Sequence, residues 1–209
     1  MKVLVVANDA QKEELVGSIN EGMDIEWVTS PEGYTGKANF DACIDLLFEN
    51  NKERVSLLRQ TQSPLVIVSS VVAPLSEIQE DIIRINGWNT FLKRPVIEAA
   101  ASNESVKEKT ERIFSGFGKK TEWVPDITGL VTARIVASVI NEAYFALEQE
   151  VSSQEEIDTA MKMGTNYPYG PFEWGKKIGL KNIYLLLSRL GKEQKRYEPA
   201  ALLTKEAIE

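Results

Sequence analysis

The sequence contains no histidine and a single cysteine among its 209 residues. Without histidine there is no Ser-His-Asp or Cys-His catalytic arrangement, no imidazole to bind a metal, and no side chain that ordinarily titrates near neutrality. Cys43 cannot form an internal disulfide, and its apolar neighbours indicate a buried, inert thiol. Acid–base chemistry in this chain therefore depends on carboxylates, lysine or tyrosine.

Long apolar runs and an excess of positive charge are also missing. The apolar start, residues 1–7, is too short for the core of a signal peptide, and no stretch approaches the length of a membrane-spanning helix. The net charge of −7 disfavours nonspecific binding to nucleic acid or to an anionic membrane. We therefore expect a cytoplasmic protein with small-molecule or protein partners, and neither nucleic acid nor membrane.

The first part of the chain alternates short β-rich runs with helical stretches, which is typical of βαβ units and a mostly parallel sheet. Asn8 and Gln11 are spaced as a capping box that opens the first helix. Strands are expected at 2–7, 25–28, 42–47 and 65–68, with weaker candidates at 88–91 and 121–124. Helices are expected at 9–21, 52–60, 74–84 and 104–114, and a loop at 30–37.

After Pro125 the pattern changes to helices alone, so we predict an α/β domain at 1–125 and an all-α domain at 126–209. The long helix expected at 129–150 carries two apolar stripes, and one stripe is enough for a surface helix. The stripes are Val131, Ile135 and Val139, and Val136, Ile140, Tyr144 and Leu147. Further helices are expected from the capping box Ser153/Glu156 to Gly164, from Pro171, and at 180–190.

The turn after the first strand lacks the features of a dinucleotide site. Residues 6–11 contain no glycine that would let the backbone approach a pyrophosphate, and Asp9 puts a negative charge there. The second strand ends on Thr29 and Ser30, so an acidic ribose ligand is missing as well, although Glu32 follows. The pattern favours a plain strand-to-helix turn over a nucleotide site.

Three C-terminal segments, residues 155–164, 166–173 and 178–180, resemble the C-terminal domain of the 3-hydroxyacyl-CoA dehydrogenases. The resemblance covers residues 126–205 well and residues 41–125 thinly; before residue 41 only the order of strand and helix agrees. It implies a reduced, Rossmann-like NAD-binding domain followed by a helical domain that forms a homodimer. It also implies NAD as the family's cofactor and an acyl-CoA as ligand, although this chain lacks the glycine-rich motif for NAD.

The resemblance also assigns the candidate site residues. Asn89 stands where the family has its catalytic histidine, and an asparagine amide cannot accept a proton. Glu98 matches the partner glutamate. Ser69 and Ser70, in the serine-rich segment, and Asn166 are candidate substrate-binding residues. Each of these residues also has a simpler structural interpretation. Glu98 would be a strand-end or loop carboxylate in water, and Asn166 would cap a turn. The aromatic run 167–174 would pack the turn onto the helices.

Three hypotheses follow from these residues. The first is a dehydrogenase relative that has lost NAD-dependent activity, with Asn89 in place of the base. The second is a homodimer that binds acyl-CoA or another small molecule, or regulates an active dehydrogenase; seven basic residues and one acidic residue at 176–196 suit phosphate groups. The third is a weakly active dehydrogenase that uses Glu98 alone, with unusual cofactor contacts.

Overall fold

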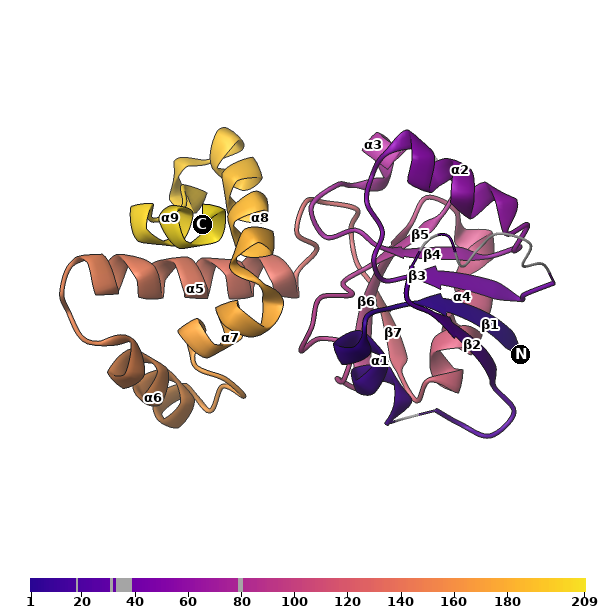
Figure 1. The fold of residues 1–209 in the computed structure, drawn as a ribbon, viewed down its shortest axis with the longest axis horizontal. Helices are drawn as coiled ribbons and strands as arrows, with labels where there is room; N and C mark the ends of the chain where they lie inside the picture. Colours follow the sequence, from indigo (N-terminus) through magenta and orange to yellow (C-terminus); the bar gives the residue numbers. More distant parts are fainter. Residues whose placement is uncertain (18, 31, 33–38, 79–80) are drawn as a thin grey trace. The chain divides into compact units, whose positions relative to one another are not determined.

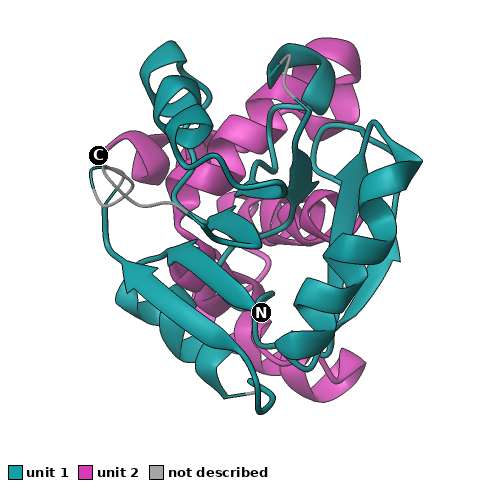
Figure 2. Cartoon of the chain, turned by 90° about the vertical axis from the view of Figure 1, so that its right-hand side faces the viewer, with its two compact units in different colours: residues 1–130 teal, residues 131–209 magenta. Residues whose placement is uncertain are grey.

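The computed structural model describes residues 1–17, 19–30, 32, 39–78 and 81–209. These form two compact units, residues 1–130 and 131–209 (Figure 2). Residues 126–130 belong to the first unit because Asp126 forms an ion pair with Arg84, and the Gly129 amide donates to the Val71 carbonyl. Most of the loop expected at 30–37 lies outside the described residues.

The first unit is built on a seven-stranded sheet, which confirms the α/β class (Figure 1). The strand order is β2-β1-β3-β4-β5-β6-β7; β5 and β6 run antiparallel, and the other neighbouring pairs run parallel. The strands are β1 (Lys2–Val6), β2 (Asp24–Val28), β3 (Ala42–Asp45), β4 (Val66–Ser69), β5 (Ile83–Ile85), β6 (Val96–Ala101) and β7 (Lys120–Trp123).

Helices cover both faces of this sheet because alternate side chains of each strand point to opposite faces. Val3 and Val5 of β1 belong to the core cluster that contains Leu15 of α1 (Asp9–Val16) and Phe114 of α4 (Lys107–Gly116). The other face of β1 packs with residues of α2 (Lys52–Gln60) and α3 (Leu75–Ile78). Both faces of the central strands are therefore buried, as their nearly continuous apolar runs require.

Several predicted elements of the first unit are confirmed, and others are wrong. The helix at 52–60 is α2, and the 3₁₀ turn Glu104–Val106 leads into α4. The first helix ends at Val16 instead of 21, with Gly17 as its C-cap. The predicted helix 74–84 is wrong at its end, because Ile83–Ile85 form strand β5; residues 79–80 lie outside the described residues. The strand expected at 88–91 is a turn, and β6 was not predicted.

The second unit is helical, as expected. α5 (Thr132–Glu148) packs against α7 (Pro171–Ile178), α8 (Leu180–Glu193) and α9 (Ala201–Ile208), and α6 (Gln154–Thr165) packs against α7. α5 begins later than predicted because Gly129 and Leu130 have φ values of 84° and 50°, which a right-handed helix does not accept. No helix in the described parts of the chain is both long and apolar enough to span a membrane.

Candidate functional site

Three candidate residues of the first unit, Ser69, Ser70 and Asn89, lie at or after the ends of β4 and β5. Ser69 is the last residue of β4 and pairs in register with Ile85 of β5. A side chain at Gly87 would have its Cβ 2.7 Å from both Cβ and Oγ of Ser69, so only glycine fits there. The structure therefore brings Ser69 beside the turn that carries Asn89.

Ser70 is a buried structural residue. Its Oγ donates to the Ala73 carbonyl at 2.9 Å, and its own carbonyl accepts from Nε of Arg84 at 2.6 Å. Arg84 is fully buried, and its guanidinium also bonds the carbonyls of Val71 and Ile127 and the carboxylate of Asp126. The hydroxyl of Ser70 thus stabilises the loop after β4, and Arg84 fixes that loop to residues 126–127.

Asn89 is half-buried in a tight turn between β5 and β6. The next residue, Thr90, has a φ of 79°, a left-handed value that is strained for a β-branched residue. Its amide donates to Oε1 of Glu14 on α1 at 2.6 Å, and the carbonyl of Arg94 accepts from Nζ of Lys119 at 3.0 Å. Side chains from distant parts of the chain therefore hold this turn.

Lys119 is a buried cation beside that turn. Burial lowers the pKa of its ammonium group, while the negative charge of Glu14 acts in the opposite direction. Glu14 uses only one carboxylate oxygen for a hydrogen bond; Oε2 is buried without a hydrogen-bond partner among the described residues. The turn at Asn89 thus lies close to one positive and one negative group.

Glu98 lies inside strand β6, as its third residue, and is half-buried. Its carbonyl accepts from the Asn86 amide at 3.3 Å, so the strand passes beside the segment that leads to Asn89. The prediction that Glu98 lies in a loop or at a strand end is therefore wrong, although its side chain is partly exposed. Its assignment as the partner of residue 89 remains a prediction.

Asn166 belongs to the second unit and ends α6 in the left-handed conformation, with φ 56° and ψ 32°. This conformation confirms the interpretation of Asn166 as a turn cap. The prediction that the helix ends at Gly164 is wrong, because Gly164 lies inside α6. The following turn is fixed by Asp158, whose carboxylate accepts from the amides of Phe172 and Glu173 at 2.8 and 3.0 Å. Asn166 is exposed, and its contact with a substrate remains a prediction.

The aromatic run 167–174 packs partly on itself and partly on Tyr144 of α5. Phe172 and Trp174 are buried, the Tyr144 and Phe172 rings are 4.9 Å apart, and both Tyr167 and Tyr169 lie about 6 Å from Trp174. The packing interpretation is confirmed for the two buried rings.

The sequence did not indicate several residues that build the site: Glu14, Arg84 and Lys119. It predicted Gln11 as part of a capping box but not its contacts with distant loops. The capping box at Asn8 is present as predicted. In addition, the side-chain Nε2 of Gln11 donates to the carbonyls of Leu46 and Gly87, which lie 35 and 76 positions away. Nothing local in the sequence signals such contacts. No group of three or more potential metal-ligating side chains occurs within the described ranges.

Comparison with known proteins places these observations in a family. The sequence pattern of the 3-hydroxyacyl-CoA dehydrogenase C-terminal domain matches residues 129–208. The 3-hydroxyadipyl-CoA dehydrogenase of Escherichia coli K12 is 38% identical over 115 residues, which are 54% of this chain and 24% of that protein. A probable 3-hydroxybutyryl-CoA dehydrogenase of Deinococcus radiodurans is 33% identical over 185 residues, 80% of this chain and 66% of that protein.

The fold extends the similarity to the whole chain. The solved structure of the (S)-3-hydroxybutyryl-CoA dehydrogenase of Ralstonia eutropha matches with a TM-score of 0.73 at 20% identity, covering 98% of this chain and 92% of that chain. In the sequence comparisons, the matched region is only 24% to 39% of the length of the E. coli, Bradyrhizobium and Bacillus relatives. The sequence similarities show that the chain belongs to the 3-hydroxyacyl-CoA dehydrogenase family, most clearly over residues 129–208.

Proposed function

We propose that this chain is a 3-hydroxyacyl-CoA dehydrogenase-like protein of acyl-CoA metabolism that does not carry out NAD-dependent dehydrogenation. The observation that carries the proposal is the absence of histidine from all 209 residues, with Asn89 at the position that the resemblance assigns to the base. Oxidation of a 3-hydroxyacyl group requires a base to take the hydroxyl proton as hydride leaves. An asparagine amide has no basic lone pair for this task.

The test is oxidation of NADH in the presence of acetoacetyl-CoA. Positioned proton transfer typically contributes about 10²–10⁴-fold to a rate, so we expect no turnover above background. Glu122→Gln is the matched control for Glu98→Gln, because the two glutamates pair in register on β6 and β7. A rate that Glu98→Gln abolishes and Glu122→Gln leaves intact would refute the proposal and favour an active enzyme that uses Glu98.

A second candidate function is binding of an acyl-CoA or a related small molecule without redox chemistry. The basic residues at 176–196 support it, because coenzyme A carries phosphates and the exposed Lys181 and Lys192 are available on α8. Calorimetry with acetoacetyl-CoA should give saturable heat that Lys181→Glu weakens. Lys205→Glu makes the same charge change outside this segment and should have little effect. Absence of heat at millimolar ligand would refute this function.

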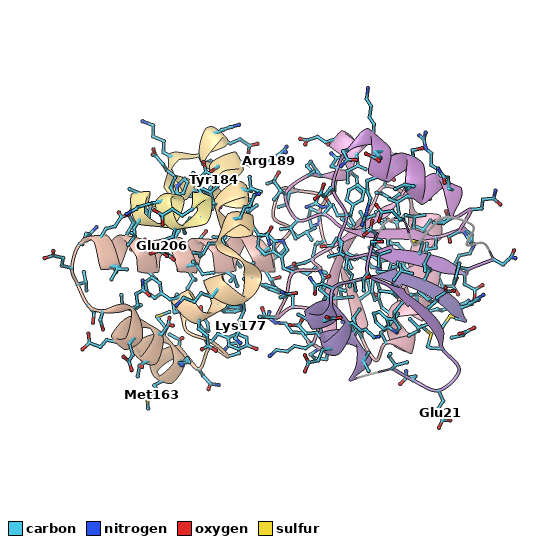
Figure 3. All side chains as sticks on the ribbon, viewed as in Figure 1. Glu21, Met163, Lys177, Tyr184, Arg189 and Glu206 are labelled. Atoms are coloured by element: carbon cyan, nitrogen blue, oxygen red, sulfur yellow. The ribbon has the colours of Figure 1, made fainter. Side chains whose placement is uncertain are left out.

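We further propose that the chain forms a homodimer through its C-terminal helices. One predicted stripe of α5 is covered, with Val136 and Ile140 buried, but Val131 and Ile135 of the other stripe are 40% and 56% exposed. α6 has no buried residue at all, and its Met163, which points outward in Figure 3, is 82% exposed. Apolar faces of this kind usually mark an interaction surface.

Light scattering at micromolar concentration tests the dimer. Ile135→Glu should shift the protein toward the monomer, because a charge in an apolar interface must be desolvated. Val96→Glu, at a 43% exposed apolar position of the first unit, is the control and should leave the mass unchanged. A monomeric wild-type protein would refute the proposal.

A further inference from the structure

The carboxyl ends of β1 and β3 meet where the strand order of the sheet reverses. β1 has β2 on one side and β3 on the other, so the crossovers run in opposite directions from this point. In open parallel sheets, ligands bind outside the carboxyl ends of the strands at such a switch point. The side chains found there decide whether a ligand fits.

At the amino terminus of α1, at this switch point, two backbone amides already bond to side chains of the capping box. The side chain of Asn8 accepts from the Gln11 amide at 2.9 Å, and Oε1 of Gln11 accepts from the Asn8 amide at 3.1 Å. Asp9 adds an exposed negative charge in the first turn. A pyrophosphate at this position would have to displace the capping box and would face a carboxylate, which disfavours its binding.

The side-chain amide of Gln11 also bridges the loops that follow β3 and β5. Its Nε2 donates to the Leu46 carbonyl at 3.0 Å and to the Gly87 carbonyl at 3.1 Å, and the residue is only 5% exposed. One buried side chain thus joins three strand ends: that of β1 through its own helix, that of β3, and that of β5. A buried carbonyl that loses its donor lowers the stability of the folded state, so we expect this bridge to stabilise the unit.

Two neighbouring carboxylates, those of Glu14 and Asp45, also accept hydrogen bonds from within the chain. Glu14 lies three residues after Gln11, on the same side of α1, and accepts from the Thr90 amide at 2.6 Å. Asp45, at the end of β3, is fully buried, and both its oxygens accept from Arg54, at 2.6 and 2.7 Å. At these strand ends, both oxygens of Asp45 and one oxygen of Glu14 therefore already have partners inside the described chain, whereas Oε2 of Glu14 has none there.

We infer that Gln11 is an internal latch that takes the place of the dinucleotide in this α/β unit. It holds the loops after β3 and β5 against α1, and the unit keeps its strand ends together without NAD. The residues of the β1–α1 turn do not fit the cofactor that the family uses. The inference rests on the proposed loss of NAD chemistry and names the residues that make nucleotide binding unnecessary.

Two substitutions at residue 11 separate the latch from the capping box. Gln11→Glu keeps the side-chain acceptor of the capping box but replaces the donating NH₂ with an oxygen that faces two carbonyls. The latch predicts that Gln11→Glu and Gln11→Ala both lower the melting midpoint by about 5 °C or more. Glu13→Ala, at an exposed position of the same helix, is the control and should change little. An unchanged or raised midpoint for Gln11→Glu would mean that Gln11 only caps the helix, and would overturn the latch.

Nucleotide binding gives a readout that does not depend on activity. The melting midpoint of the wild-type protein should not move with millimolar NAD, NADH or ADP-ribose, because a ligand that binds the folded state must raise it. A saturable rise without turnover of NADH would overturn the latch and leave the proposed function intact. Turnover of NADH with acetoacetyl-CoA would instead overturn the proposed function.

Discussion

Replacement of Arg84 by methionine should be among the most damaging single changes in the first unit. The guanidinium is fully buried and donates to the carbonyls of Ser70, Val71 and Ile127 at 2.6, 3.2 and 2.7 Å, besides its ion pair with Asp126. Methionine occupies much of the same volume but donates no hydrogen bond. Three carbonyls and one carboxylate would then each lose a donor. The Val71 and Ile127 carbonyls keep the amides of Gly129 and Leu130, so the Ser70 carbonyl is the most affected.

The size of the effect follows from burial. Removing one partner of a buried ion pair costs about 3–5 kcal/mol. Asp126 is 26% exposed and keeps its bond from the Leu75 amide, so water relieves part of that cost. Methionine also regains some apolar burial. We therefore expect a loss of ~2–4 kcal/mol in the free energy of unfolding, from the broken ion pair with Asp126 and from the Ser70 carbonyl that loses its donor.

Urea unfolding followed by tryptophan fluorescence measures this loss. In a Trp174→Phe background, the three remaining tryptophans, at positions 27, 88 and 123, all report on the first unit. Arg112→Met is the matched control, because Arg112 is 68% exposed and pairs with Glu108 on the surface of α4. Such a pair contributes less than about 1 kcal/mol. Equal losses for the two variants would show that the Arg84 network does not stabilise the unit.

Three further changes test the second unit. Asn141→Ala removes a buried amide that donates to the Glu198 carbonyl and accepts from the Ala200 amide, both at 2.9 Å, and should cost ~2–4 kcal/mol in urea unfolding. A cost below 1 kcal/mol would contradict this reading. Glu156 accepts from the hydroxyls of Ser152 and Ser153 and from the Ser153 amide, which lower its pKa from 4.5 to about 2. Its contribution to stability should therefore be complete above pH 4.5 and disappear as the pH falls through about 2; a carboxyl titration by NMR with a midpoint near 4.5 would exclude it. Gly170→Ala should lower the melting midpoint by several degrees, because its new Cβ would clash with the side chain of Asp158, and an unchanged midpoint would show that the turn adapts.

Local signals in the sequence predicted well the elements whose ends are marked by caps. α2 begins after Asn51, whose side chain accepts from the Arg54 amide, and it has the predicted bounds. The capping boxes at Asn8 and Ser153 are both present. In such cases the residues that define the element lie within a few positions of one another, and the sequence contains the information directly.

The segment after β4 shows where that information ends. Leu75, Ile78 and Ile82 have helical spacing and do share one core cluster, yet among the described residues of this segment only Leu75–Ile78 are helical. The chain then becomes β5, whose partners β4 and β6 are supplied by the sheet. β6 itself is rich in alanine, a poor strand former, and so gave no pattern to detect. Pairing between distant strands decided both cases.

The same distinction applies to the candidate site: some of its residues were named from the sequence, and others are brought in by contacts between distant parts of the chain. The sequence identified Ser69, Asn89 and Glu98, and the fold places their segments next to one another. It did not identify Gln11 as a bridge or Arg84 as a clamp, because a hydrogen bond to a backbone carbonyl leaves no trace in the identity of the residue that provides the carbonyl.

The contact of Asp158 with the start of α7 has a consequence for how the second unit folds. α7 has eight residues, too few for a stable helix in water, and Gly170 offers it no capping side chain. The carboxylate that receives its first free amides comes from α6. Nucleation of α7 therefore depends on a helix that has already formed, so the two helices should appear together in folding and lose amide protection together as one cooperative segment.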